Sequence, residues 1–182
     1  MKTIIREEAK KIRDAIPMRT RKEKEKKILS YLKTLPLGKH VFIYKSMRSE
    51  VSTEEIIEWL LHSGAAVYLP RIDASDNSMQ PHIFNPGDPL ERSSFGMEEP
   101  VNEPLFELSL LSCVIIPLLA FDPQLQRLGY GGGFYDRFLP RTPEALRIGI
   151  AFSEQMVDRL EPLETDIPLD YIVTDSGIHS LI

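Results

Sequence analysis

The chain has 182 residues, of which 42% are hydrophobic and 27% are charged, and its formal net charge is −5. These values are ordinary for one soluble globular domain. The longest apolar run, from Cys113 to Phe121, contains Pro117 and is far shorter than the roughly 20 residues of a membrane helix, so no membrane partner is expected. The single cysteine excludes an internal disulfide and a cysteine-cluster zinc site.

Charge is distributed unevenly along the chain. The N-terminal sequence becomes charged too early for a secretory signal peptide, so we expect a cytoplasmic protein. Every lysine lies at or before Lys45, which makes residues 1–48 strongly basic and residues 49–182 strongly acidic. This asymmetry is typical of a nucleic-acid-binding patch or of a site for an anionic small molecule. A solvated helix surface explains it equally well.

The first helix is expected from Thr3 to Ile16, because Pro17 cannot continue it. Apolar residues at helical spacing form the face expected to pack on the core: Ile5, Ala9, Ile12 and Ile16. A separate face of the same helix is basic and carries Lys2, Arg6, Lys10 and Arg13.

Two further helices are each predicted from a capping box, in which a serine or threonine precedes a glutamate by three residues. Thr20 and Glu23 open a helix that runs to about Leu35. Ser52 and Glu55 open the next helix, which Gly64 closes.

Apolar segments between and after these helices predict the strands of a sheet. They are Val41–Tyr44, Ala66–Leu69, Met79–Phe84, Val114–Pro117, Arg147–Phe152 and Tyr171–Thr174. Pro70 stops the second strand, and residues 71–100 resemble excursion loops around the third. Alternating strands and helices predict an α/β fold, a three-layer α/β/α sandwich with a mostly parallel open sheet. We expect one domain over residues 1–182, with basic helices at 1–36 and an α/β core at 37–182.

Ligands of such sheets bind beyond the carboxyl ends of the strands. Three segments follow strand ends here, namely Tyr44–Glu50, Pro70–Arg71 and Phe121–Asp136. We therefore expect them to converge on one cleft.

Four of the ten glycines fall within Gly129–Gly133, between an apolar strand and a short helical pattern from Tyr135 to Leu139. Crowded glycines allow positive φ and let main-chain amides approach a ligand, and consecutive exposed amides bind anions such as phosphate. A strand, a loop and a helix start in this order add the helix dipole at the same point. We interpret the run as the phosphate-binding part of an active site; the alternative is a purely structural glycine-rich turn.

Familiar nucleotide motifs do not fit this run. A dinucleotide fingerprint would need glycine in place of Phe134, and a P-loop would need a lysine where none exists beyond Lys45. The four histidines lack metal-ligand spacing, and a G-x-S-x-G elbow is absent from the sequence. What remains is a phosphate held by amides, with Arg127 as a nearby cation. Asp136 either joins that phosphate through Mg²⁺ or is a partner of the helix dipole.

The string Arg-Leu-Gly-Tyr-Gly-Gly-Gly-Phe-Tyr-Asp at 127–136, preceded by Pro-Leu-Leu-Ala-Phe-Asp at 117–122, resembles the signature of the 5-formyltetrahydrofolate cyclo-ligase family. Residues 44–53, 69–71, 95–100 and 152–155 resemble further family segments in the same order. The resemblance implies ATP- and Mg²⁺-dependent conversion of 5-formyltetrahydrofolate to 5,10-methenyltetrahydrofolate, with release of ADP and phosphate. The formyl oxygen would attack the γ-phosphorus to give an iminium phosphate, and the neighbouring aryl nitrogen would close the ring.

The resemblance also implies roles for individual residues. ATP would be held by Lys2, Arg6, Arg127, Leu128, Gly129, Tyr130, Gly131, Gly132, Gly133, Phe134 and Tyr135. The folate would be contacted by Tyr44, Lys45, Glu50, Tyr130, Gly131, Gly132, Gly133 and Phe134. Catalysis would involve Arg127, Tyr135 and Asp136, and Mg²⁺ would be held by Asp136 and Asp166. We expect a monomer that uses small-molecule substrates and no nucleic acid.

Some points stay open at this level. Glu50 could accept the paired N–H donors of a reduced pterin, or it could be a carboxylate at the entry of the following helix. Some relatives carry a basic side chain in place of Gly132, so one phosphate-facing cation is missing unless Arg137 or Arg141 supplies it.

The competing hypothesis for the function is a nucleic-acid-binding module that uses the basic N-terminal region. A sugar-phosphate isomerase or acyl-transfer enzyme on the same fold is a third.

Overall fold

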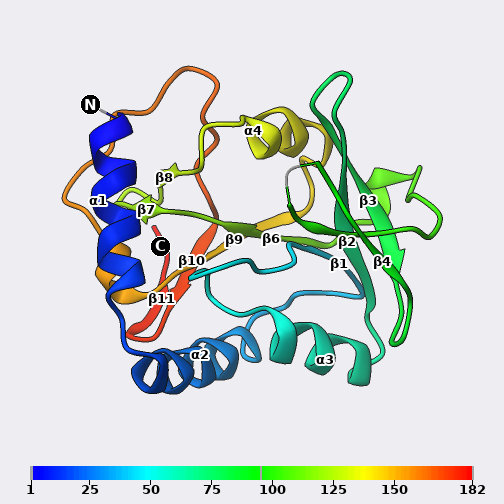
Figure 1. Ribbon diagram of the computed structural model, residues 1–182, viewed down its shortest axis with the longest axis horizontal. Coiled ribbons are helices and arrows are strands. Elements are labelled where there is room, and N and C mark those ends of the chain that lie inside the picture. Colours follow the sequence, from blue (N-terminus) through cyan, green and yellow to red (C-terminus); the bar gives the residue numbers. More distant parts are fainter. Residues whose placement is uncertain (1, 95, 182) are drawn as a thin grey trace.

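A computed structural model describes residues 2–94 and 96–181 of the chain. At its centre lies a seven-stranded sheet with the order β11-β10-β9-β6-β1-β2-β3 (Figure 1). The five inner strands pair in parallel and both edge strands pair antiparallel, which confirms the mostly parallel open sheet. The inner strands are β1 (His40–Ile43), β2 (Ala66–Asp73), β6 (Cys113–Pro117), β9 (Leu146–Ile150) and β10 (Tyr171–Thr174), and the edges are β3 (Ser78–Phe84) and β11 (Gly177–His179).

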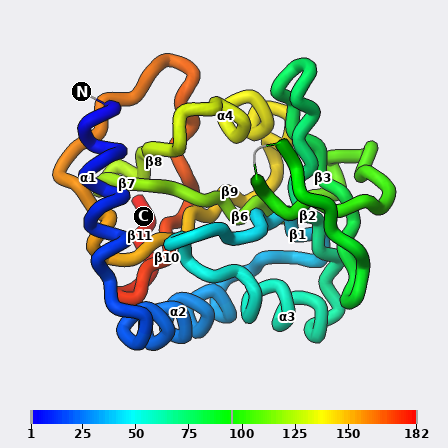
Figure 2. The backbone as a smooth tube through the Cα atoms, in the orientation of Figure 1, coloured from blue at the N-terminus to red at the C-terminus, as the bar shows by residue number. Residues whose placement is uncertain are grey.

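Helices lie on both faces of this sheet, as the three-layer prediction requires (Figures 1 and 2). Helices α2 (Met18–Leu32) and α3 (Glu54–His62) cover one face, and the short α4 (Phe134–Phe138) lies on the other. Helix α1 (Lys2–Asp14) stands at one side of the sheet. The described residues also form 3₁₀ turns at Leu108–Leu110, Leu139–Arg141 and Ser153–Gln155. Within residues 2–94 and 96–181, no helix combines the length and the apolarity needed to cross a membrane.

The central strand β6 contributes to two separate cores, because successive side chains of a strand point to opposite faces of the sheet. Cys113 and Ile115 pack in the core beneath α2 and α3, whereas Val114 and Ile116 pack with Phe138 of α4. All of them are fully buried. A strand buried on both faces has a continuous apolar sequence, which explains the hydrophobicity of this segment.

The buried face of the first helix differs in part from the prediction. Ala9 is buried as expected, and so is Ile16, which lies just beyond the end of α1. Ile5 is half-buried, Ile12 is 47% exposed, and Arg13 is buried next to it. The side of the helix that packs on the rest of the protein therefore includes Arg13 from the basic face and leaves out Ile12 from the apolar face.

Both predicted capping boxes are wrong. Helix α2 begins directly after Pro17, so Thr20 lies inside the helix, and no side chain caps its first turn. Proline needs no partner for a missing N–H and therefore suits a helix start. Helix α3 has Thr53 rather than Ser52 as its N-cap residue. The hydroxyl of Thr53 makes no cap bond and instead accepts a hydrogen bond from the amide of Ser46 at 3.0 Å.

Residues 71–100 contain more strand than the sequence predicts. Strand β2 does not stop at Pro70 but continues to Asp73, paired throughout with β3. Pro70 and Pro81 lie opposite each other in this pairing. Neither has a main-chain N–H, so they fit a pair of positions that exchange no hydrogen bond between the strands. A second hairpin, β4 (Leu90–Arg92) with β5 (Glu98–Pro100), was not predicted. Phe95, the first residue of the family-like segment 95–100, lies outside the described residues.

Candidate active site

A cavity of about 670 Å³ opens where the carboxyl ends of β1, β2 and β6 meet. Its lining includes the loop after β1, Pro70 of β2, Pro117 at the end of β6, and the segment from Arg127 to Arg137. One face of α1 closes the cavity from the side. The three segments expected to converge therefore do so.

Every residue predicted for the site lines this one cavity. They are Lys2, Arg6, Tyr44, Lys45, Glu50, Arg127, Leu128, Gly129, Tyr130, Gly131, Gly132, Gly133, Phe134, Tyr135, Asp136 and Asp166. The structure brings them together from α1, from the loop after β1, from the glycine loop and from the segment before β10. Their individual roles remain predictions.

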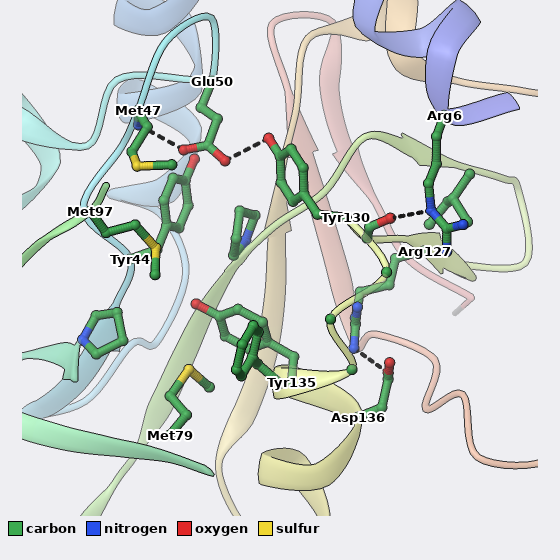
Figure 3. A pocket seen from close by; sticks show the side chains of 18 of the residues that line it. Arg6, Tyr44, Met47, Glu50, Met79, Met97, Arg127, Tyr130, Tyr135 and Asp136 are labelled. Atoms are coloured by element: carbon green, nitrogen blue, oxygen red, sulfur yellow. Dashed lines mark hydrogen bonds and ion pairs between the residues drawn. The ribbon is translucent and has the colours of Figure 1, made fainter. Parts of the chain in front are cut away.

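The cavity also contains side chains that the site prediction left out. Lys10 and Arg13 belong to the basic face of the first helix, and that face lines the cavity. Met47, Met79 and Met97 line it as well (Figure 3). These methionines come from three segments that are far apart in the sequence, so their spacing does not predict that they line one cavity.

A short hairpin delivers the glycine loop to the cavity. The strand predicted at Val114–Pro117 is β6, but the apolar stretch Cys113–Phe121 does not run directly into the glycine loop, because β7 (Ala120–Phe121) pairs with β8 (Arg127–Leu128). The buried carboxylate of Asp122 shapes the turn, accepting bonds from the amides of Gln124 and Gln126 at 3.0 Å each. The strand–loop–helix prediction is thus corrected to strand, hairpin, loop and helix.

The glycine loop lines the cavity and has unpaired main-chain amides. Gly131 and Gly133 have φ values of +99° and +67°, which an L-residue with a side chain rarely adopts. The Nε of Arg6 donates a hydrogen bond to the carbonyl oxygen of Gly129 at 2.9 Å (Figure 3). Among the described residues, none accepts a hydrogen bond from the main-chain N–H of Gly131, Gly132 or Gly133. These donors are available to a ligand.

Arg127 and Asp136 form a largely buried ion pair beside the loop. The Nη2 of Arg127 lies 2.5 Å from Oδ1 of Asp136, and the arginine side chain is only 6% exposed. Its Nε is buried and has no hydrogen-bond partner among the described residues. The guanidinium also lies over the ring of Tyr135, 5.8 Å from its centroid. A buried unpartnered donor costs free energy, so this atom suits an acceptor from a ligand.

Asp166, the second predicted metal ligand, pairs with Lys2 at 2.8 Å. Burial raises the pKa of Asp166, but hydrogen bonds from the Leu163 amide and from Lys2 outweigh it and hold that pKa below its usual value. Asp136 and Asp166 thus both line the cavity, each already paired with a cation. Among the described residues, no three His, Cys, Asp or Glu side chains gather as a metal cluster.

The opposite half of the cavity is apolar and aromatic. We call Tyr44, Met47, Met79, Met97 and Tyr135 the apolar half. Figure 3 shows Tyr44 and the three methionines across from Arg6 and Arg127, whereas Tyr135 lies between the two sides and contacts Arg127. The hydroxyl of Tyr44 donates to the carbonyl oxygen of Val51 at 3.0 Å. Burial raises the pKa of both Tyr44 and Tyr135 above the ordinary value, so both phenols are neutral at physiological pH.

Glu50 lies at the edge of the apolar half. Its Oε1 accepts a hydrogen bond from the hydroxyl of Tyr130 at 2.6 Å, and its Oε2 accepts one from the amide of Met47 at 2.7 Å (Figure 3). Burial raises the pKa of Glu50, and these two bonds oppose that effect. No bond joins the carboxylate to the first turn of α3 among the described residues, which argues against the helix-entry alternative.

Arg137 supplies a cation near Gly132, and Arg141 does not. The Nη2 of Arg137 donates to the carbonyl oxygen of Gly132 at 2.9 Å, and its side chain lines the cavity. Arg141 instead donates to the carbonyl oxygen of Met79 at 3.5 Å, and its own side chain does not line the cavity. The ring of Phe134 fills the space at Gly132, since a Cβ there would lie 2.6 Å from it. Any larger residue at 132 would have to displace that ring.

A parallel sheet with its cavity at the carboxyl ends of the strands is the arrangement by which α/β enzymes bind small molecules. The chain falls in that class. Its sequence matches the 5-formyltetrahydrofolate cyclo-ligase family over residues 1–175. The chain therefore belongs to this family of ligases.

Individual relatives are similar over most of their length. The 5-formyltetrahydrofolate cyclo-ligase of Escherichia coli (strain K12) is 36% identical over 143 residues, which cover 76% of this chain and 79% of that protein. The protein of the same name from Haemophilus influenzae is 31% identical over 173 residues, 91% of this chain and 92% of that protein. The 5,10-methenyltetrahydrofolate synthetase structure from Aquifex aeolicus superposes with a TM-score of 0.85 at 30% identity, covering 99% of this chain and 92% of that one.

Proposed function

We propose that the chain catalyses the ATP- and Mg²⁺-dependent cyclisation of 5-formyltetrahydrofolate to 5,10-methenyltetrahydrofolate, releasing ADP and phosphate. The main support for this proposal is that one cavity has two chemically different halves. Unpaired amides and cations line one half, and aromatic and methionine side chains with one carboxylate line the other. Such a cavity suits a triphosphate and a pterin side by side.

ATP binds by its phosphates to the glycine loop. The free amides of Gly131 to Gly133 are donors of the kind that bind phosphate oxygens. Lys2 and Arg6 add positive charge from α1. The Nε of Arg127 has no partner within the described residues and can donate a hydrogen bond to a phosphate oxygen. These groups neutralise the charge of the transferred phosphoryl group without any protein nucleophile.

Asp136 and Asp166 fit a magnesium site of the kind that nucleotides complete. Mg²⁺ is commonly held by one or two carboxylates together with substrate phosphates, so two carboxylates in the cavity suffice. The ion would neutralise charge on the β- and γ-phosphates. Arg127 holds Asp136 in place through their ion pair.

The folate binds in the apolar half. Tyr44 and Tyr135 offer aromatic surface to the pterin, and Met47, Met79 and Met97 offer adaptable apolar contacts. Each oxygen of Glu50 accepts one hydrogen bond within the protein and keeps a further acceptor site for pterin N–H groups. Lys45 lines the same cavity as a cation for the substrate's carboxylates.

The chemistry follows from bringing the two substrates together. The formyl oxygen attacks the γ-phosphorus, the bond to the bridging oxygen breaks, and ADP leaves. The neighbouring aryl nitrogen then attacks the activated formyl carbon and loses its proton, and phosphate departs with the former formyl oxygen. Positioning and charge neutralisation are the protein's contribution to both steps.

The nucleic-acid alternative is disfavoured by the orientation of α1. It would need the basic face of this helix for contacts with a phosphate backbone. Lys2, Arg6, Lys10 and Arg13 instead line the cavity.

Absorbance in the near ultraviolet tests the proposed function. Purified protein with 5-formyltetrahydrofolate, ATP and Mg²⁺ should form the methenyl product, with one ADP and one phosphate for each product molecule. Omission of ATP should abolish the signal. If the complete mixture yields no methenyl product, or if product forms equally without ATP, the proposal is wrong.

A further inference from the structure

Arg13 is a fully charged side chain that is only 2% exposed. Its Nη1 donates to the hydroxyl oxygen of Tyr130 at 2.8 Å, and its Nε donates to the hydroxyl of Ser49 at 3.0 Å. The guanidinium also lies 5.7 Å from the centroid of the Tyr130 ring. A charge this deeply buried is maintained by specific partners, and these partners are the glycine loop and the loop that carries Glu50.

The chemistry of arginine fixes the direction of the hydrogen bonds around Tyr130. A guanidinium has donors and no acceptor, so the Tyr130 oxygen must accept from Arg13. The single hydroxyl hydrogen of Tyr130 is then directed to Oε1 of Glu50, 2.6 Å away. The chain of bonds runs one way, from Arg13 through Tyr130 to Glu50.

A second arginine holds Arg13 in place. The Nη2 of Arg21 donates to the carbonyl oxygen of Arg13 at 2.8 Å, and its Nη1 donates to that of Ser49 at 2.5 Å. Arg21 is 8% exposed and packs over the ring of Phe152, 5.3 Å from the centroid. The end of α1 and the Glu50 loop are therefore fixed relative to each other.

We propose that Arg13 is a positioning residue for folate binding. Arg13 acts through the Tyr130 hydroxyl to keep the Glu50 carboxylate ionised and directed at the substrate. The inference rests on the proposed function for the identity of that substrate. Tyr130 belongs to the glycine loop, so the same bonds join the folate-binding carboxylate to the phosphate-binding loop. No contact between Arg13 and substrate is required.

The electrostatics around Glu50 agree with this role. Burial raises its pKa, whereas the bonds from Tyr130 and Met47 and the positive charge of Arg13 lower it. Removing Arg13 takes away a cation and frees the Tyr130 hydroxyl to turn elsewhere. The charged and titratable groups that face Glu50 are Arg13 from α1, Arg48 from its own loop, Tyr44 after β1, Tyr130 from the glycine loop and Tyr135 from α4.

The test compares Arg13→Met with Lys11→Met. Both substitutions remove one positive charge from α1, but Lys11 is exposed and does not line the cavity. Carbon-13 NMR of the side-chain carboxyl groups, with Glu50→Gln for assignment, should show a higher pKa for Glu50 in Arg13→Met alone. The KM for 5-formyltetrahydrofolate should rise roughly tenfold, as expected for loss of a charged hydrogen bond. The KM for ATP should change by less than about threefold.

A second variant keeps the test valid if Arg13→Met folds poorly. Tyr130→Phe removes the bridging hydroxyl but keeps the ring of a residue that is 45% exposed, and it leaves the charge of Arg13 in place, so it perturbs the fold less than Arg13→Met does. Tyr130→Phe alone should raise the folate KM and the pKa of Glu50, because it removes the bond to the carboxylate. In the Tyr130→Phe background, Arg13→Met should add little further increase in the folate KM. Equal increases in both KM values with an unshifted Glu50 titration, or full additivity of the two substitutions, would overturn the inference. The NMR titration needs no substrate, so it decides on the bond chain even if the wild-type protein proves inactive.

Discussion

Glu50 and Asp136 are carboxylates in the same cavity with different neighbours. Asp136 is paired with the positive charge of Arg127 at 2.5 Å, whereas Glu50 accepts bonds from two uncharged donors, the Tyr130 hydroxyl and the Met47 amide. Burial raises the pKa of Glu50. These surroundings support the proposed roles, Asp136 beside the phosphates and Glu50 as an acceptor for neutral N–H donors.

Substitution of Glu50 should affect folate binding selectively. Glu50→Gln keeps the size but loses the negative charge, so the KM for 5-formyltetrahydrofolate should rise about tenfold, and the KM for ATP should rise less. Because the pKa of Glu50 is raised, the wild-type folate KM should increase as pH falls through a range above that of an ordinary glutamate. Glu50→Gln should lack this dependence. Steady-state kinetics between pH 5 and 8 measures both effects, and equal changes for both substrates would indicate a structural role only.

Substitution of Asp136 should affect turnover rather than folding. Asp136→Asn retains an oxygen that can accept from Arg127 but loses the charge proposed to face Mg²⁺, so turnover should fall by about a hundredfold or more. Asp158→Asn is the matched control, because Asp158 is exposed and does not line the cavity. Turnover and thermal melts of both variants provide the measurement. Wild-type turnover in Asp136→Asn would remove this residue from the site.

At the scale of elements, the phosphate-binding hypothesis depends on the conformation of the glycine loop. The sequence predicts a turn there from glycine content alone, and the positive φ values of Gly131 and Gly133 confirm that glycine is needed. It does not predict the β7–β8 hairpin, because strands of two residues have no detectable alternation. The side-chain carboxylate of Asp122 stabilises that hairpin, since it accepts hydrogen bonds from the amide of Gln124 within the turn and from the amide of Leu160, which is distant in the sequence.

Gly131→Val should weaken nucleotide binding. The φ of +99° is unfavourable for a β-branched residue, and a Cβ at this position would lie 3.5 Å from the guanidinium of Arg6. We expect at least about a tenfold loss of ATP affinity by calorimetry. Gly87→Val imposes similar strain at a φ of +85°, with nothing within 4 Å of the added atom and no place in the cavity lining. It should destabilise the protein without changing ATP affinity, and equal affinities in both variants would refute the prediction.

Strands β9 and β10 are joined at their starts by Arg147 and Asp170. The amide, Nε and Nη2 of Arg147 all donate to this carboxylate, at 2.8, 3.0 and 2.6 Å. Burial alone would raise the pKa of Asp170, but these bonds outweigh it and lower the pKa below 3.8. The stabilisation is therefore complete above the unfolded-state pKa and is lost as pH falls through the lower folded-state value.

Asp170→Asn should lower the melting temperature by about 5 °C at neutral pH. The difference from wild type should shrink as pH falls through the folded-state pKa of Asp170, because the wild-type carboxylate then also loses its charge. Glu161→Gln is an exposed control and should melt as wild type does. Thermal melts at several pH values provide the measurement. A constant difference at every pH would show that the ion pair is not its source.

At the scale of the whole molecule, the position of the site was predictable because the rule for parallel sheets depends on topology alone. The sequence identified the inner strands, and their carboxyl ends meet at the cavity as expected. Lys2 and Asp166 lie at opposite ends of the chain, and only the resemblance to the family predicted that both belong to the site. The methionines and the buried state of Arg13 could not be predicted, because they depend on how α1 and the excursion hairpins pack in three dimensions.

In the proposed reaction, this cavity brings the formyl oxygen of the folate to the γ-phosphorus of ATP. Substrate labelled with oxygen-18 in the formyl group distinguishes this transfer from hydrolysis by water. After a single turnover, mass spectrometry of the released phosphate should find one labelled oxygen for each methenyl product formed. Label found in water instead, with unlabelled phosphate, would rule out attack of the formyl oxygen on the γ-phosphorus.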